Sequence, residues 1–314
     1  MPKWFSFALL LCAAFVAAQF SAAQDNPSPS AAPESSAQGT QADSALALAP
    51  DPPAEGAPPD PIPVQASVPV PVPAPSEWRI LGSQWKSLAP DLLHEQKRMW
   101  LFPTSIVRGH HLKPTLALLG ATALLTTVDA HNATWVRNSL RPLGGFNNAF
   151  AGYNTATATE AFASAFYIVA IARRNAYDQQ TFMLAGEAVI NAEILTTVMK
   201  DVDGREAPIS YPAGGDFKDS WFKVRRGTRS GWVGGLGSMP SGHEIAIMAV
   251  ATTFAERYPH PAWHRWLAYG LAAAAGLSRV TLQSHFTSDT FAGAALGYVI
   301  SRYVVLGRQP KPSN

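Results

Sequence analysis

The sequence predicts an all-α protein: a helical bundle of about six core helices, preceded by a signal peptide and a disordered Pro-rich arm. Of its 314 residues, 47% are apolar and 15% are charged, a composition typical of a folded chain. From Trp78 onward apolar residues recur at helical spacing, and strand patterns are scarce. By contrast, 14 of the 26 prolines lie between Pro27 and Pro75, where no packed core can form.

The first 23 residues have the pattern of a cleaved secretory signal. Lys3 precedes the apolar run Trp4–Ala18, and the small residues at 21–23 suit a signal peptidase. An uncleaved membrane anchor is the alternative. The one cysteine, Cys12, falls inside this segment, so the mature chain forms no disulfide. We therefore expect an exported protein, periplasmic or associated with the cell envelope.

Residues 24–76 are expected to form a disordered, acidic linker ahead of a mildly basic domain at 77–308 and a tail at 309–314. The linker carries six acids and no Lys or Arg, whereas residues 77–314 carry 23 Lys and Arg against 16 Asp and Glu. Its segment Pro61–Pro75 predicts an extended polyproline II spacer. A basic surplus of this size favours anionic ligands without naming one.

The apolar segments of the domain indicate helices. Asp91 is expected to cap the first of them. A polar, Gly-rich stretch, Asp201–Ser241, interrupts the series, and loops of that length are usually functional or disordered. The predicted helices span Leu92–Leu101, Pro114–Val128, Glu160–Ala172, Thr181–Met199, Gly242–Arg257, Trp266–Leu282 and Ser288–Val305.

Integral insertion into a membrane is the less favoured interpretation of these helices. A spanning helix needs about 20 mostly apolar residues, and the longest uncharged apolar run, Pro114–Val128, has 15. Glu187 and Glu193 interrupt another helix. Burial inside a soluble bundle explains the segments better than lipid contact.

A Pro-Ser-Gly-His sequence at 240–243 leads directly into a predicted helix. The free N–H groups of a first helical turn point at whatever lies in front of them. Gly242 has no Cβ, so an anion can approach the backbone beside Ser241 closely. His243 follows at once, where an imidazole can give or take a proton near neutral pH. Taken alone, such a turn is usually an ordinary helix cap.

Ser278-Arg279 is followed by His285 and Asp289. The last two are four residues apart, which predicts that they share one helix face. The carboxylate can then hold one imidazole nitrogen as N–H and leave the other free to attack. Arg279 supplies a planar fork that matches phosphate oxygens. An ordinary helix-surface pair is the alternative for the histidine and the aspartate.

A third motif runs from Lys200 to Pro208. Lys200 ends a predicted helix, where the helix dipole favours a cation, so a capping lysine is its plainest interpretation. The functional interpretation makes Lys200 and Arg205 phosphate ligands on a turn fixed by Gly204 and Pro208.

Together these motifs resemble the type 2 phosphatidic acid phosphatase (PAP2) superfamily, which also holds bacterial class A acid phosphatases and vanadium haloperoxidases. Its signature is Lys-x6-Arg-Pro, then Pro-Ser-Gly-His, then Ser-Arg-x5-His-x3-Asp. The last two elements match in full, and the resemblance covers roughly Asp91–Val305. In the first, Lys200 and Pro208 align, but Ala207 stands where the superfamily has arginine, and Arg205 is expected to take over its phosphate contact. The resemblance implies the superfamily's helical bundle, with the site between helix ends.

The resemblance also implies a metal-independent phosphatase, a phosphoric monoester hydrolase that acts on a phosphorylated small molecule or a lipid phosphate without a cofactor. His285, oriented by Asp289, attacks phosphorus and becomes a phosphohistidine. His243 protonates the leaving oxygen and then activates water. The phosphate-binding residues implied are Lys200, Arg205, Ser241, Gly242 and Arg279.

Two other functions stay open from the sequence. A vanadate-dependent haloperoxidase would use the same scaffold with vanadate as its cofactor, whereas vanadate would inhibit the phosphatase. A non-catalytic anion-binding module of the envelope would bind phosphate without turnover, and Ala207 favours it. A membrane surface is a further candidate partner, and the oligomeric state is not determined.

Other patterns predict no site of their own. The histidine pair at 110/111 has no Cys or acid nearby at ligand spacing, and the pair at 260/264 is separated by Pro261 in a predicted loop. No metal site is therefore predicted. The glycines of Gly231–Gly237 follow no strand, which argues against a dinucleotide site. The basic loop Lys218–Arg229 is better suited to shape substrate access or to contact anionic headgroups than to bind nucleic acid.

Overall fold

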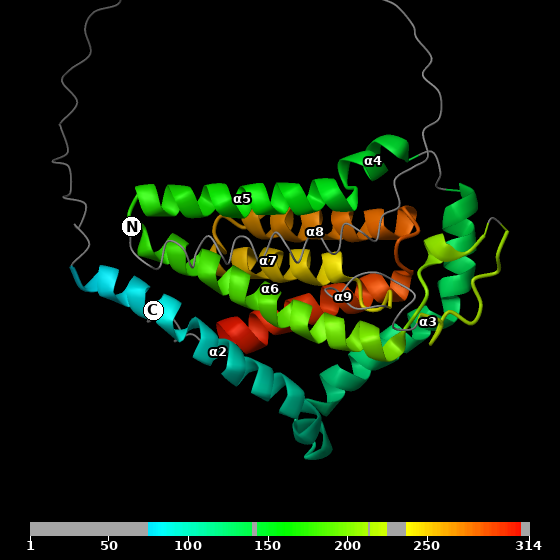
Figure 1. The fold of residues 1–314 in the computed structure, drawn as a ribbon, viewed down its shortest axis with the longest axis horizontal. Coiled ribbons are helices and arrows are strands. Elements are labelled where there is room, and N and C mark those ends of the chain that lie inside the picture. Colours follow the sequence, from blue (N-terminus) through cyan, green and yellow to red (C-terminus); the bar gives the residue numbers. More distant parts are fainter. Residues whose placement is uncertain (1–74, 140–142, 213, 225–236, 309–314) are drawn as a thin grey trace, which may run out of the picture. The chain divides into compact units, whose positions relative to one another are not determined.

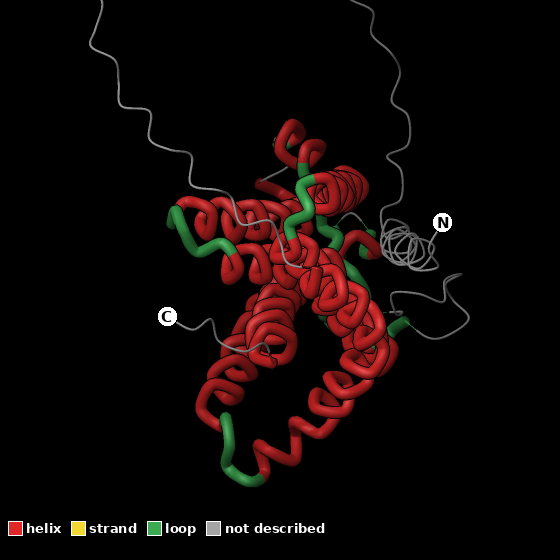
Figure 2. The backbone as a smooth tube through the Cα atoms, turned by 90° about the vertical axis from the view of Figure 1, so that its left-hand side faces the viewer, coloured by secondary structure: helices red, strands yellow, loops and turns green. Residues whose placement is uncertain are grey.

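The computed structural model of the protein describes residues 75–139, 143–212, 214–224 and 237–308. The predicted signal peptide, almost all of the linker and the tail lie outside the described residues and stay predictions. Within them every regular element is helical, as Figure 2 shows, which confirms the all-α prediction.

The described residues form eight α-helices and three short turns of other helical type. In chain order they are α2 (Pro75–Val107), α3 (Leu112–Ser139), α4 (Gly144–Ala149), α5 (Gly152–Ala172), α6 (Ala176–Asp203), η1 (Pro208–Ser210), α7 (Gly242–Arg257), α8 (Trp263–Thr281), α9 (Thr287–Val299), η2 (Ile300–Val305) and η3 (Leu306–Arg308).

The predicted helices are confirmed, most of them at greater length, and α7 has the predicted bounds. The prediction that Asp91 caps a helix is wrong, because α2 begins at Pro75 and passes through this position. Packing against α6 supports α2 beyond its local signal. The Asp91 carboxylate pairs instead with the Arg308 guanidinium, Oδ1 to Nη1 at 2.7 Å.

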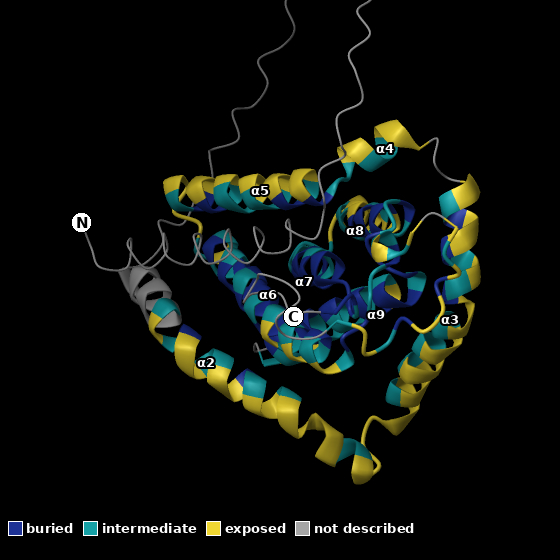
Figure 3. Ribbon diagram, turned by 45° about the vertical axis from the view of Figure 1, so that its right-hand side comes forward, coloured by how far each residue is buried: buried dark blue, intermediate teal, exposed yellow. Residues whose placement is uncertain are grey.

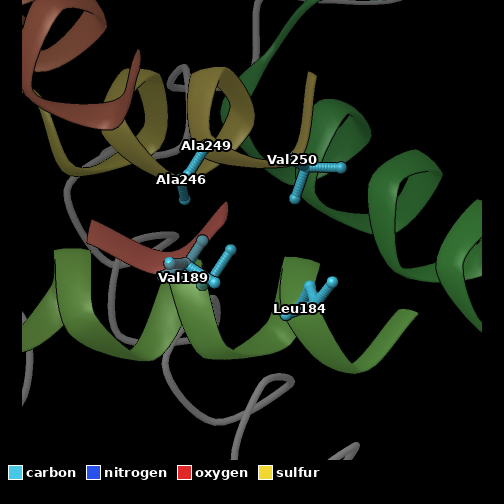
Figure 4. Close-up of a cluster of buried hydrophobic side chains, with 7 residues drawn as sticks. Leu184, Val189, Ala246, Ala249 and Val250 are labelled. Carbon is cyan, nitrogen blue, oxygen red and sulfur yellow. The ribbon is translucent and has the colours of Figure 1, made fainter. Parts of the chain in front are cut away.

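Helix α7 is the centre of the bundle and packs on α6, α8 and α9 (Figures 1 and 3). Figure 4 shows Ala246, Ala249 and Val250 of α7 facing Leu184 and Val189 of α6. Small side chains let the helix axes approach closely. Helix α9 also approaches closely, because a Cβ on Gly297 would clash with the Ile245 carbonyl and lie 3.1 Å from the Ala249 backbone nitrogen.

The outer helices leave many apolar side chains exposed, and three segments are long and apolar enough to cross a membrane. They are Gly152–Ala172, Ala176–Asp203 and Thr287–Arg308, with 21, 28 and 22 residues. On α8 the Trp266 side chain is 78% exposed. These features support membrane association.

Uninterrupted apolar runs do not exclude a spanning helix in these segments. Their helices extend beyond the predicted ends, and each contains an 18-residue stretch of high mean hydropathy with at most two charged residues. Length and composition allow integral insertion as well as surface association.

Candidate active site

The start of α7 is tied to the helices on both sides of it. Ser241 caps the helix, its Oγ accepting from the Glu244 backbone N–H at 3.5 Å, and its own N–H donates to the Asp289 carbonyl at 3.0 Å. A Cβ on Gly242 would lie 3.7 Å from the Lys200 Nζ. Lys200, in the last turn of α6, therefore reaches the first turn of α7, as the motifs require.

His285 and Asp289 are close, but they do not share a helix face. Helix α9 begins at Thr287, after His285. The Asp289 carboxylate fixes the N-terminus of α9 there. Its Oδ2 accepts the backbone N–H of Phe286 at 3.0 Å and so caps the first turn of the helix. The same Oδ2 lies 3.7 Å from the His285 Nδ1, so Nδ1 faces the carboxylate and Nε2 is left for other chemistry.

Arg279 lies in the last turn of α8 and is 2% exposed. Its Nη2 donates to the Ser278 Oγ at 2.8 Å and to the carbonyl of Phe150, and its Nε donates to the same Oγ at 3.2 Å. Neighbouring groups thus orient the guanidinium before any ligand is present.

Arg205 has partners that the sequence did not indicate. Its Nη2 donates to the Asp129 Oδ2 at 2.6 Å, and its Nη1 donates to the Asp289 Oδ1 at 2.5 Å. Its guanidinium carbon lies 4.5 Å from the ring centre of Trp221 and 4.2 Å from that of Phe286. The expected phosphate contact of Arg205 therefore competes with two buried carboxylates and stays a prediction.

The side chains predicted for the site are buried together at helix ends. The His243 Nε2 is buried without a hydrogen-bond partner, whereas the His285 Nδ1, which also has none, faces the Asp289 carboxylate. A buried polar atom left unpaired costs about 1–3 kcal/mol, so the His243 Nε2 is a candidate contact for a ligand. The predicted residues found buried are Lys200, Arg205, Ser241, Gly242, His243, Arg279, His285 and Asp289.

Sequence reasoning missed four residues that complete this site. Asp129 had a usable signal, because it is an acid at the end of the apolar run of α3. Phe150 and Gly152 had none, since a backbone carbonyl and a missing side chain leave no chemical pattern. Glu244 is 1% exposed, and burial raises its pKa to about 8 although the Arg279 charge opposes this. It is therefore largely neutral at neutral pH and repels an anion little.

Among the described residues, no group of three or more His, Cys, Asp or Glu side chains is arranged to hold a metal ion.

Binding of an anion is expected to bring a proton onto His243. Burial lowers the pKa of this imidazole well below its usual value, and the positive charges of Arg279 and Lys200 lower it further. The ring is therefore neutral near neutral pH, and a bound dianion would offset the neighbouring cations and raise its pKa. Between the lowered and the raised pKa, each unit fall in pH should strengthen binding by on the order of tenfold.

Sulfate is the suitable probe, because it stays a dianion between about pH 5 and pH 8, the range in which histidine titrates. Calorimetric titration should show affinity rising as pH falls, with proton uptake. The variant His243→Gln should bind sulfate with a flatter pH dependence. An equal pH dependence in the two proteins would contradict the assignment to His243.

The fold and the site thus define a helical protein whose cationic and imidazole side chains gather, buried, at the ends of four helices. Residues 181–312 match the family model of the PAP2 superfamily, which confirms the resemblance over this part of the chain. Among solved structures, the protein is similar to a transmembrane PAP2 type phosphatidylglycerolphosphate phosphatase from Bacillus subtilis. The identity is 17% and the TM-score 0.42, over 63% of this chain and 98% of that chain. No curated protein matches the chain.

Proposed function

We propose that the protein is a phosphatase that cleaves phosphomonoesters, with lipid-linked phosphates as the favoured class, through a phosphohistidine on His285. The PAP2 superfamily match supports a phosphatase-type function. The finer proposal rests on two buried imidazoles beside the buried cations Lys200 and Arg279: the Nδ1 of His285 faces the Asp289 carboxylate, and the Nε2 of His243 has no hydrogen-bond partner.

The charges support binding of a phosphoryl group. Lys200, Arg279 and the N–H groups of the first turn of α7 supply positive charge in a buried setting, where it acts more strongly than in water. Positioning and charge neutralisation provide most of the catalysis of phosphoryl transfer. These side chains would do so without a metal ion.

The proposed reaction has two steps. In the first, the His285 Nε2 forms a bond to phosphorus while the ester P–O bond breaks, and His243 gives its proton to the leaving oxygen. In the second, His243 takes a proton from water, the water oxygen bonds to phosphorus, and the P–N bond breaks to release phosphate. Asp289 holds Nδ1 as the protonated nitrogen throughout.

The substrate proposal rests on the surroundings of the site. Exposed apolar side chains on α5 and α8, together with three candidate spans, would keep the protein at a lipid surface. A phosphate ester carried on a lipid is concentrated there, whereas a soluble ester is not.

Phosphate release by the purified protein tests the proposal. We expect release from p-nitrophenyl phosphate and, faster, from a short-chain lipid phosphate in detergent, each with a chelator present, and inhibition by vanadate. His285→Ala should abolish release, a loss of at least about 10³-fold for a covalent nucleophile. His94→Ala, at an exposed position on α2, is the matched control and should keep full activity.

Each failure of this experiment has a distinct meaning. Release that persists in His285→Ala would refute the phosphohistidine, and release lost to the chelator would refute metal independence. Faster release from p-nitrophenyl phosphate would refute the lipid preference. Sulfate binding without release from either ester would favour the non-catalytic anion-binding module.

A further inference from the structure

The first turn of α5 lies against two residues of the site. A Cβ on Gly152, the first residue of this helix, would lie 2.6 Å from the Arg279 Nη1 and 3.0 Å from the His243 Nε2. Contacts under 3.0 Å to a Cβ are essentially never tolerated, so an added methyl group would displace the guanidinium and crowd the imidazole. Two nitrogen atoms from different helices therefore converge on the Cα of one glycine.

This contact is held in place by the residues around it. The carbonyl of Phe150 accepts from the Ser278 Oγ at 2.7 Å and also from Arg279. The Thr281 Oγ1 donates to the Asn147 Oδ1 at 2.5 Å. These bonds dock the junction of α4 and α5 on the last turn of α8, an arrangement visible in Figure 1. Gly152 is thus part of a fixed wall.

The imidazole that faces this wall lacks a partner. His243 is 6% exposed, and its Nε2 has no hydrogen bond. The first N–H groups of α5 likewise have no acceptor within their own helix. An unpaired ring nitrogen, a guanidinium and the start of a helix that meet at one point suit an anionic oxygen.

We propose that Gly152 is a positioning and specificity-determining residue of the site, and that the leaving oxygen of the phosphoester binds beside its Cα. The acid that protonates this oxygen must lie within hydrogen-bond reach of it, and on the proposed reaction that acid is His243. The lack of a Cβ at residue 152 then keeps the oxygen within reach of both Nε2 and the Arg279 Nη1. This inference rests on the proposed phosphatase function.

Gly152→Ala tests the proposal, because alanine is favoured over glycine in a helix and the fold should be kept. The matched control is Gly145→Ala in α4, where a Cβ would meet nothing within 4 Å. We expect Gly152→Ala to lower kcat on an alkyl phosphate by on the order of 10²-fold, as a misplaced catalytic group does. On p-nitrophenyl phosphate, whose leaving group needs little protonation, the loss should be several-fold smaller. Gly145→Ala should match the wild type on both esters.

A binding measurement separates this proposal from the proposed function. Gly152→Ala should bind sulfate on the order of tenfold more weakly than Gly145→Ala, since the guanidinium is displaced. If the wild-type protein hydrolyses neither ester but the binding difference is found, the phosphatase function is refuted. The positioning role of Gly152 toward Arg279 is then still supported. Unchanged sulfate binding and unchanged turnover in Gly152→Ala would refute the positioning role of Gly152. An equal loss on the two esters would overturn the placement of the leaving oxygen.

Discussion

Replacing Asp129 by alanine is expected to destabilise the protein by about 3–5 kcal/mol, the cost of removing one partner from a buried ion pair. Asp129 is 2% exposed and pairs with Arg205 at 2.6 Å. It also accepts the Ser288 backbone N–H at 3.1 Å and the hydroxyl of the same residue. Without it, the Arg205 charge loses one of its two hydrogen-bonded carboxylates and keeps Asp289. Thermal and denaturant unfolding of the purified full chain measures the change.

The exposed pair of Asp216 and Lys218 provides the control for this prediction. Their atoms are 3.2 Å apart, but the two side chains are 66% and 72% exposed. Asp216→Ala should therefore change the free energy of unfolding far less than Asp129→Ala does, because solvent screens an exposed pair. A loss for Asp129→Ala no greater than that for Asp216→Ala would show that the buried network of Arg205 contributes little to stability.

Asp289→Asn is expected to lower kcat by on the order of 10⁴-fold, the loss that the same change produces in other enzymes whose histidine is oriented by a buried carboxylate. Asp289 is fully buried. Its Oδ1 accepts from Arg205, and its Oδ2 accepts the Phe286 N–H and faces the His285 Nδ1. An amide of the same shape removes the charge that stabilises a protonated or phosphorylated His285. Steady-state and single-turnover kinetics on p-nitrophenyl phosphate measure the loss.

Sulfate affinity shows whether Asp289→Asn lowers kcat by impairing the reaction itself or by disrupting the anion-binding site. Lys200, Arg279 and the start of α7 are unchanged in Asp289→Asn, so sulfate affinity should fall by less than about tenfold. Asp178→Asn, in the first turn of α6 at the other end of that helix from Lys200, should keep both activity and binding. A fall in kcat of less than about tenfold for Asp289→Asn would refute the orienting role of the carboxylate.

The helices could be predicted because their signals are local. Apolar periodicity and helix caps act over a few residues, and α7 accordingly has its predicted bounds. Longer helices escaped prediction where tertiary packing extended them, as in α2, which passes Pro90 to lie along α6. Uninterrupted apolar runs underestimated the candidate membrane spans, because a helix can carry a few charged residues and still be long and apolar enough to cross a membrane.

The candidate site was predictable as far as its motifs reach. The motifs place cationic and imidazole side chains at fixed spacings, and this pattern can be recognised in a sequence. The structure finds all four of these side chains buried near helix ends: Lys200, His243, Arg279 and His285. The expected helix-face pairing of His285 and Asp289 was wrong. Spacing alone does not show that the Asp289 carboxylate caps the helix and leaves the histidine outside it.

By itself, therefore, the sequence determined that this protein is helical and which motifs meet, because periodicity and motif spacing are properties of short segments. Only the tertiary structure decided what surrounds those motifs. It brought Asp129 to Arg205 across 76 residues of sequence and Phe150 to Ser278 across 128. Contacts over such separations depend on how whole helices pack, and a carbonyl or an absent Cβ has no signature in a sequence until a neighbouring helix lies against it.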